Sequence, residues 1–135
     1  MSQILIDTNI LIDFLRQKSS IKKQGTLFYR YFYLQENQPA LSLITLSELW
    51  AGRSMGQKNT RQKIDRLIGS CRVLLPNLET AKLTGKILRQ AYEKGRPIAF
   101  QDAAIASCAI YHQLPLLTLN TKHFQNIAKL KLISD

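Results

Sequence analysis

Short apolar runs alternate with longer polar segments of helical periodicity along almost the whole of this chain. Runs with the length and composition of strands lie at residues 3–6, 39–44, 71–75, 116–119 and 130–134. Helical spacing of apolar residues follows the first two runs and recurs over about residues 20–36, 57–69, 77–94 and 101–112. Strands and helices that alternate in this way form right-handed βαβ crossovers. The pattern therefore predicts an α/β fold with a central parallel sheet of about five strands and helices on both faces.

Short polar side chains mark the expected helix starts. Thr8 or Asn9 is expected to cap the helix after the first run, and Thr45 or Ser47 the helix after the second. Asn77 is expected to cap the long helix that ends near residue 94.

The length of 135 residues suits one domain, and no linker, repeat or low-complexity tract divides the chain. We therefore expect a single domain over residues 1–135. No apolar stretch approaches the roughly 20 residues that cross a bilayer, and the N-terminus lacks a secretory pattern. These absences predict a cytoplasmic protein with no membrane partner. Cys71 and Cys108 have neither metal-site nor disulfide spacing and are interpreted as reduced packing residues.

The balance of charge is strongly basic, with 19 Lys and Arg against 9 Asp and Glu and a net charge of +10. An excess of cations on a small domain attracts polyanions and speeds their encounter. Nucleic acid is therefore the leading class of partner. A basic surface kept for solubility and one neutralised by an acidic protein are the alternatives that charge alone leaves open.

Three of the few acids lie in apolar segments. Asp7 ends the first strand, Glu48 follows the second strand by one helical turn, and Asp102 heads the apolar face of a helix. Ligand sites of parallel sheets form at the carboxyl ends of strands, which is where these acids are expected. For Asp102 alone, helix capping is an alternative role.

Carboxylates that converge repel one another unless a cation compensates them. Oxygen ligands without paired His or Cys favour Mg²⁺ or Mn²⁺ over Zn²⁺. Magnesium held by a few carboxylates keeps water molecules that can attack a phosphodiester. The three acids thus indicate a hydrolytic nuclease site.

Four motifs occur in order along the chain: Asp7-Thr8-Asn9-Ile10, Thr45-Leu46-Ser47-Glu48-Leu49, the segment 97–106 with Asp102, and Thr118-Leu119-Asn120-Thr121-Lys122-His123-Phe124. Together they resemble the PIN-domain ribonucleases, and among these the VapC toxins of toxin–antitoxin pairs. The resemblance covers essentially the whole chain. It implies a PIN-like three-layer α/β/α sandwich, a Mg²⁺- or Mn²⁺-dependent endoribonuclease activity on RNA, and inhibition by a cognate antitoxin protein in a homodimer or higher assembly.

The resemblance also implies roles for individual residues. Asp7 and Asp102 would be the principal metal ligands, and Glu48 a further ligand or the holder of a metal-bound water. Thr8 and Asn9 would support Asp7 through hydrogen bonds. Capping of the first helix is equally compatible with the positions of Thr8 and Asn9.

The last motif departs from the family pattern, because many members have another Asp where this chain offers Asn120 and His123. Asn120 can present a neutral oxygen, and a site with less negative charge should hold a second metal weakly. His123 can contact phosphate when protonated or move a proton near neutral pH. A structural histidine packed beside Phe124 is the alternative.

A dense group of aromatic residues occupies the second predicted helix. We expect part of this group to form a surface that binds an antitoxin or a second copy of the chain. The residues proposed for that surface are Phe28, Tyr29, Phe32 and Tyr33. One helical face can bury only two or three of the rings in this segment, and base stacking on RNA is the alternative use of the others. Trp50 is assigned to the core.

Basic residues of the polar helix and its approach are candidate nucleic-acid contacts: Arg53, Lys58, Arg61 and Lys63. A solvated helix face is the alternative interpretation.

Two other enzyme classes fit less well. A haloacid-dehalogenase-type phosphatase places a second Asp two residues after the first, where this chain has Asn9. A receiver domain needs an Asp after a central strand, whereas the candidate strand at residues 71–75 is followed by Pro76. A PIN-like binding module with a weak or inactive site and an RNA-processing nuclease that is not a toxin are the alternatives kept.

Overall fold

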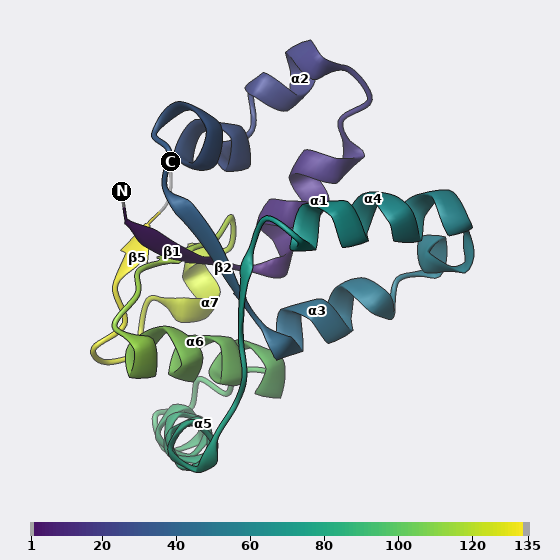
Figure 1. Ribbon diagram of the computed structural model, residues 1–135. Coiled ribbons are helices and arrows are strands. Elements are labelled where there is room, and N and C mark those ends of the chain that lie inside the picture. The colour runs from purple at the N-terminus through teal and green to yellow at the C-terminus, as the bar shows by residue number, and fades with distance from the viewer. Residues whose placement is uncertain (1, 134–135) are drawn as a thin grey trace.

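The computed structural model describes residues 2–133 and has a parallel sheet between two layers of helices (Figure 1). The strands are β1 Gln3–Ile6, β2 Gln38–Ser42, β3 Arg72–Leu74, β4 Leu116–Leu117 and β5 Leu132–Ile133. The helices are α1 Thr8–Arg16, α2 Ser20–Gln24, α3 Leu43–Trp50, α4 Lys58–Ile68, α5 Leu78–Glu93, α6 Phe100–His112 and α7 Thr121–Phe124, with a π-helix η1 Tyr29–Leu34 and a 3₁₀ helix η2 Arg53–Gly56. All five predicted strands are present, although the last prediction extends to residue 134, outside the described residues.

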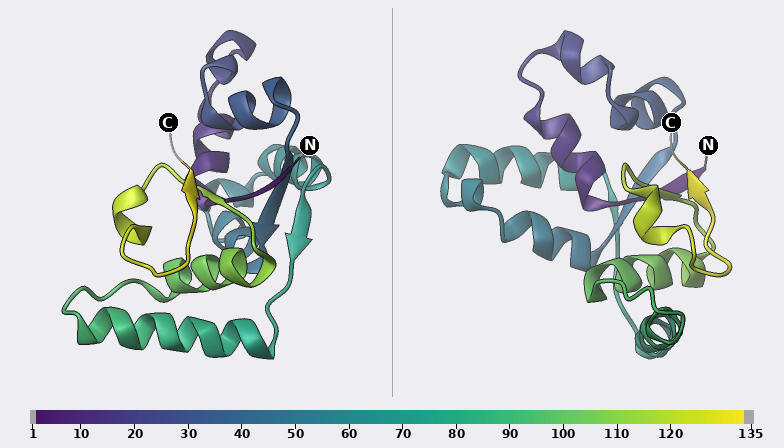
Figure 2. Two further views of the ribbon diagram at one scale, coloured as in Figure 1. Left: turned by 90° about the vertical axis from the view of Figure 1, so that its left-hand side faces the viewer. Right: turned by 180° about the vertical axis from the view of Figure 1, so that it is seen from behind.

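The sheet has the strand order β3-β2-β1-β4-β5, and every neighbouring pair is parallel. Helices α1 and η1 lie on one face, and α5 and α6 lie on the other (Figures 1 and 2). This arrangement confirms the predicted α/β/α sandwich. Within residues 2–133, no helix has both the length and the apolar character needed to cross a membrane.

Alternate residues of the strands supply two separate halves of the core. Ile4 and Ile6 of β1 pack on the side of α1, and Leu5 packs on the side of α6 with Ala106. This division follows from the two-residue period of a strand, in which successive side chains point to opposite faces. Burial on both faces explains why the strand runs of the sequence are continuously apolar.

Two predicted helix caps are wrong by a few residues. Asp7 caps α1 in place of Thr8 or Asn9, and Ser42 caps α3 by accepting a hydrogen bond from the amide of Thr45. In both places the helix follows the strand within one residue, so the extended residue just before the helix becomes the cap: Asp7 directly after β1, and Ser42 at the end of β2. Asn77 caps α5 as predicted, in a reciprocal capping box with Thr80.

The predicted helix over residues 20–36 is divided into α2 and η1. The break lies at Gly25 and Thr26, where the Thr26 hydroxyl donates to the carbonyl of Lys23 and accepts from the amide of Tyr29. A threonine that bonds its neighbouring backbone in this way competes with a continuous helix. The break lets Phe28 turn into the core, where its ring centre lies 4.7 Å from that of Phe14.

The assignment of Phe28 to a partner surface is therefore wrong, since this side chain is 2% exposed. Tyr29 and Phe32 are half-buried and Tyr33 is 55% exposed, so those three remain at the surface at least in part. The assignment of Trp50 to the core is also wrong, because this residue is 44% exposed at the end of α3.

Candidate active site

Asp7 stands where the strand order reverses. The chain passes from β1 to β2 on one side and later returns to β4 on the other side of β1. The amide of Asp7 donates to the carbonyl of Leu117 in β4, at 3.0 Å, so the residue lies beside the end of that strand. A crevice opens at such a reversal because the connections from the two strands leave in opposite directions. The topology thus places Asp7 at the expected ligand site of the sheet.

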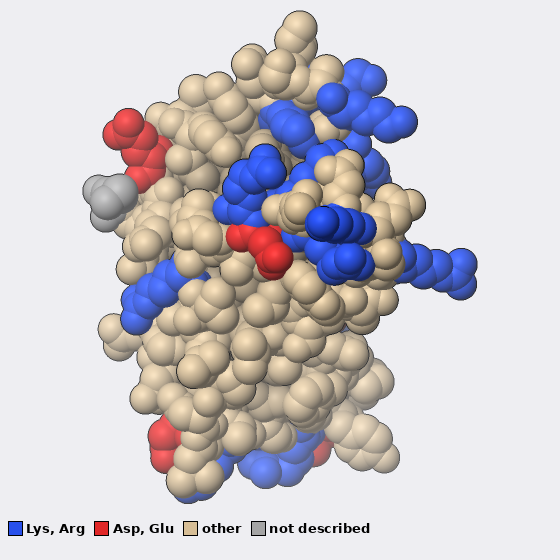
Figure 3. All heavy atoms as spheres, turned by 45° about the vertical axis from the view of Figure 1, so that its right-hand side comes forward, with Lys and Arg blue, Asp and Glu red and all other residues tan. Residues whose placement is uncertain are grey.

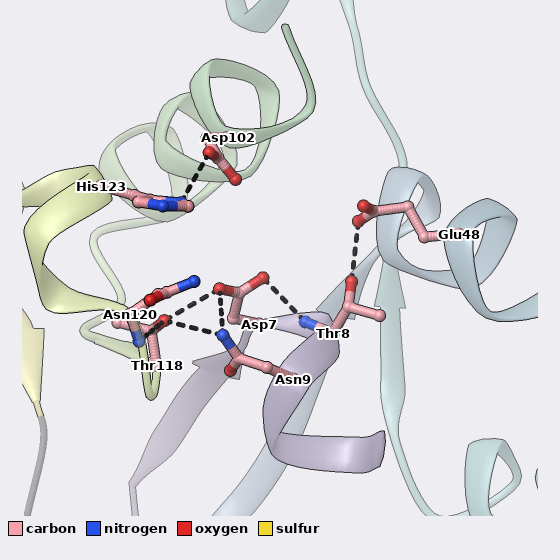
Figure 4. Close-up of polar contacts among 8 residues, drawn as sticks. All are labelled: Asp7, Thr8, Asn9, Glu48, Asp102, Thr118, Asn120 and His123. Carbon is pink, nitrogen blue, oxygen red and sulfur yellow. Dashed lines mark hydrogen bonds and ion pairs between the residues drawn. The ribbon is translucent and has the colours of Figure 1, made fainter. Parts of the chain in front are cut away.

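Three donors hold the Asp7 carboxylate (Figure 4). Its Oδ1 accepts from the amide of Thr8 at 2.8 Å, and its Oδ2 accepts from the Thr118 hydroxyl at 2.8 Å and from Asn9 Nδ2 at 3.2 Å. The residue is only 6% exposed. These contacts fix both oxygens, and they confirm the geometric support expected from Thr8 and Asn9.

Burial raises the pKa of the Asp7 carboxyl, and the hydrogen bonds from Thr118 and Thr8 oppose this shift. The negative charge of Asp102 raises the pKa of Asp7 further, and His123 lowers it. Burial and a nearby like charge both disfavour the ionised carboxylate. A cation between Asp7 and Asp102 would relieve both effects.

Asp102 lies in the first turn of α6, and its Oδ2 is 3.2 Å from Nδ1 of His123 on α7. The side chain of Asp102 is 21% exposed and that of His123 is 53% exposed. The ring of His123 also lies near Phe124, with the ring centres 6.5 Å apart. His123 therefore contacts a predicted site acid directly.

Glu48 joins the site through Thr8. Its Oε1 accepts a hydrogen bond from Thr8 Oγ1 at 2.7 Å, while the residue itself is exposed on α3. Figure 4 shows Glu48 on one side of Asp7, with Asp102 and His123 on the other. In the described part of the chain, no three His, Cys, Asp or Glu side chains are close enough together to hold a metal ion. The fold thus brings the three predicted acids to one edge of the sheet without drawing them into a closed cluster.

Asn120 caps no helix with its side chain, although it precedes α7. Its backbone amide donates to Thr118 Oγ1 at 3.0 Å, and Figure 4 places the side chain of Asn120 beside Asp7. The amide oxygen of Asn120 and the carboxylates of Asp7 and Asp102 are hard donors of the kind that Mg²⁺ and Mn²⁺ prefer. The chemistry of the residues present therefore suits a hard divalent cation.

Thr118 is the site residue to which the sequence assigned no role. It is fully buried at the end of β4, donates to Asp7 and accepts from Asn120. The sequence gives no signal for this role, because Thr118 lies within the run at residues 116–119 and there resembles any other strand residue. Because the hydroxyl connects β1 to the last motif, it orients the carboxylate of Asp7.

Replacing Thr118 by Val should lower the free energy of unfolding by about 1–3 kcal/mol, because the isosteric side chain leaves the backbone amide of Asn120 without its acceptor. The same change removes the donor that favours ionised Asp7. Thermal or urea unfolding measures the loss, and Thr118→Ser, which keeps the hydroxyl, should recover most of it. Destabilisation by Ser together with unchanged stability in Val would show that the methyl group, and not the hydrogen bonds, matters at this position.

The predicted nucleic-acid residues lie on η2 and α4. Arg53, Lys58 and Lys63 are exposed, whereas Arg61 donates from Nη1 to the carbonyl of Met55 at 2.9 Å. Lys63 lines a cavity beside Phe14, toward the end of α1 that points away from the site, and this cavity includes none of the three acids.

Comparison with known proteins gives a consistent result. Residues 4–130 match the family described as PIN domain. The chain is 31% identical to "Ribonuclease VapC1" of Haemophilus influenzae, over 94% of this chain and 93% of that protein. It is 28% identical to "tRNA(fMet)-specific endonuclease VapC" of Shigella flexneri, over 97% of this chain and 96% of that protein.

Among solved structures, VapBC2 from Rickettsia felis bound to a DNA fragment from its promoter superposes with a TM-score of 0.83 and 26% identity, covering 98% of both chains. The family match over residues 4–130 contains β2, β3 and β4, β1 except its first residue, and every residue of the site described above. The sequence motifs, the strand order and these similarities agree, and the chain belongs to the PIN domain family.

Proposed function

We propose that this protein is a metal-dependent endoribonuclease and the toxin of a toxin–antitoxin pair. The observation that carries the proposal is Asp7, a carboxylate 6% exposed at the reversal of the strand order, fixed by three donors and facing the charge of a second acid. A structural acid would need neither this position nor this neighbour. The relatives of this PIN domain are named ribonucleases, which supports cleavage of RNA.

Asp7 and Asp102 would hold Mg²⁺ or Mn²⁺, with Glu48 positioned through Thr8 as a further acid. When bound, such an ion lowers the pKa of a coordinated water and stabilises charge on phosphate oxygens. The protein itself supplies orientation. Thr118, Thr8 and Asn9 fix the Asp7 carboxylate, so its orientation is set before a ligand binds.

One tightly held ion is proposed in preference to two. The last motif supplies Asn120 and His123 in place of a further carboxylate, and His123 lies in contact with Asp102. A second divalent cation would then have fewer negative ligands than the first.

The substrate is proposed to be RNA. The formal net charge of +10 attracts a polyanion, and the Shigella flexneri relative is named for a tRNA. The partner is proposed to be a cognate antitoxin, since a solved relative from Klebsiella pneumoniae is a toxin–antitoxin complex, and a homodimer or larger assembly is expected with it. Tyr29, Phe32 and Tyr33 are the proposed contact surface for the antitoxin, because their rings remain wholly or partly accessible.

The proposal predicts that the purified chain, free of antitoxin, cuts a mixed pool of RNA only when Mg²⁺ or Mn²⁺ is present. Chelation with EDTA should stop cleavage, and added Mn²⁺ should restore it. Gel analysis of end-labelled RNA measures the products, and a mock preparation that carries Asp7→Asn controls for contaminating nucleases. Cutting that continues in EDTA would reject the metal-dependent mechanism, and RNA binding without cutting under every metal condition would favour an inactive binding module.

A further inference from the structure

A cavity of about 530 Å³ opens beside the proposed active site. Its walls come from α5, from the connection between α5 and α6, from the first turn of α6 and from α7. Asp102 and His123 belong both to this wall and to the site. A substrate that reaches Asp102 therefore has this cavity directly next to it.

The wall of the cavity is strongly basic. Among residues 2–133, the lining residues include one acid, Asp102, and five cations. The cations are Lys86, Lys94, Arg96, Lys122 and Lys129. Over residues 2–133, none of these five side chains has a carboxylate within ion-pair distance. Unpaired cations in a concave wall add their potentials and attract a polyanion more strongly than the same charges on a convex surface.

The backbone places these cations at the entrance to α6. Gly95 has a φ of +70°, the left-handed conformation that ends α5, and Lys94 and Arg96 stand on either side of it. Lys122 precedes His123 on α7. The backbone thus sets the positions from which these side chains extend near Asp102.

The interior of the same cavity is apolar, with Ile87, Ile98 and Ile127 among its lining residues. Phosphates bind to cations, while the faces of unstacked bases bind to apolar surfaces. A cavity that combines both surfaces suits a single strand of nucleic acid better than it suits a small anion.

A second basic region lies elsewhere on the molecule. Figure 3 shows Lys and Arg side chains gathered on the side of α2 and α4, where Lys18, Lys63 and Arg66 line another cavity together with Phe14. Phe14 is six residues along α1 from Thr8, which corresponds to about 9 Å of helix. This second cavity includes none of the three acids.

We propose that the cavity between α5, α6 and α7 binds the single-stranded RNA that flanks the scissile phosphate. Lys94, Arg96 and Lys122 bind the backbone phosphates, and the apolar interior accepts a base. This inference rests on the proposed function, because it names the place where the substrate of that reaction is held. It moves RNA recognition from the basic face of α4 to the wall that contains Asp102.

The test measures binding separately from cleavage. A fluorescein-labelled single-stranded RNA of about twelve nucleotides is titrated in EDTA with the full-length protein, and anisotropy is recorded at several salt concentrations. The variant Lys94→Gln, Arg96→Gln, Lys122→Gln should bind about 100-fold more weakly at 0.1 M salt, because about three phosphate contacts change the slope of log affinity against log salt by about 2. Circular dichroism checks that each variant is folded.

A matched control removes three cations of the same neighbourhood that do not line the cavity, with Lys82→Gln, Arg89→Gln and Lys131→Gln. This control should bind as the unmodified protein does, although its net charge falls equally. A third variant, Arg53→Gln, Lys58→Gln, Lys63→Gln, tests the face of η2 and α4.

Weaker binding by the cavity variant alone supports the inference. An equal loss of affinity in the matched control would show that net charge alone governs binding. A loss of affinity confined to the third variant would place the RNA on α4. Either result overturns the inference.

Cleavage of the same RNA by the unmodified protein with Mg²⁺ is measured in parallel. If cleavage fails and cavity-dependent binding remains, the proposed function fails; if cleavage succeeds and the cavity variant binds normally, only the inference fails.

Discussion

Asp7→Asn is expected to lower the rate of RNA cleavage by about 1000-fold or more while the protein remains folded. The carboxylate is the least exposed acid of the site, and an amide in its place removes the negative charge that would hold a cation. Asparagine nevertheless preserves the shape of the side chain and is as good a helix cap as Asp. A loss of cleavage would therefore report on charge and not on unfolding.

The same substitution should make the stability of the protein in EDTA less dependent on pH, because the amide carries no charge at any pH. Burial and the charge of Asp102 raise the pKa of Asp7 above its ordinary value, so the folded state binds this proton more tightly than the unfolded state does. The stability that protonated Asp7 contributes is complete below the unfolded pKa and is lost as pH rises through the folded pKa. At neutral pH the carboxylate thus destabilises the fold, and the amide does not.

Thermal unfolding of both proteins at about pH 4 and pH 7 measures this effect. The gap between the melting temperatures of Asp7→Asn and the unmodified protein should widen, in favour of the variant, as pH rises from 4 to 7. Asp13→Asn is a matched control, because it makes the same change on the same helix at a residue paired with Arg16 at 3.3 Å. Asp13→Asn should cleave normally.

The alanine variant separates capping from catalysis. Asp7→Ala removes the common acceptor of the hydrogen bonds from Thr8, Asn9 and Thr118. This variant should therefore lose about 1–3 kcal/mol of unfolding free energy in addition to its cleavage activity.

One outcome for the asparagine variant would contradict the proposed active site. If Asp7→Asn cleaves RNA at the original rate, Asp7 is only a helix cap and the proposed active site is wrong.

The position of Asp7 could be predicted because it follows from burial alone. Ile4 and Ile6 face one layer of helices while Leu5 faces the other, so the strand is apolar on both sides until its last residue. A charge at that boundary is visible without coordinates. The same reasoning correctly located Asp102 at the head of a buried helix face.

Contacts between distant segments could not be predicted in the same way. The hydrogen bond from Thr8 to Glu48 spans 40 residues, and that from Thr118 to Asp7 spans 111 residues. Neutral hydroxyls at strand ends give no pattern that distinguishes a ligand holder from a turn residue. The predicted caps of α1 and α3 were wrong for a related reason, since each helix follows its strand so closely that the extended residue just before the helix becomes the cap.

The aromatic segment illustrates the limit of helical periodicity. Spacing by four residues predicted pairs of rings, and Tyr29 with Tyr33 and Phe28 with Phe32 do pack against each other, with ring centres 5.1 Å and 4.9 Å apart. The spacing did not show which pair faces inward, because a local break at Thr26 and the wider turn of η1 set the rotation. The net charge likewise indicated nucleic acid as the leading class of partner, but it could not show which of two basic surfaces adjoins the acids.

Phe28→Ala and Tyr33→Ala should therefore separate folding from partner binding. Phe28 is 2% exposed and packs on Phe14, so its truncation should lower the free energy of unfolding by about 3–5 kcal/mol, a large share of the stability of a typical domain. Tyr33 is 55% exposed, and its truncation should cost about 1 kcal/mol or less. Urea unfolding measures both values.

Binding of the cognate antitoxin should respond mainly to the exposed ring. An aromatic side chain at the centre of an interface contributes about 2 kcal/mol or more, so Tyr33→Ala should weaken the complex at least about 30-fold in calorimetry. Tyr92→Ala is the matched control, because Tyr92 is 77% exposed on α5 and remote from η1. Unchanged affinity in Tyr33→Ala, or an equal loss in Tyr92→Ala, would exclude η1 as the antitoxin surface. The accessible rings of η1 would then have to serve a second copy of the chain or stack on RNA.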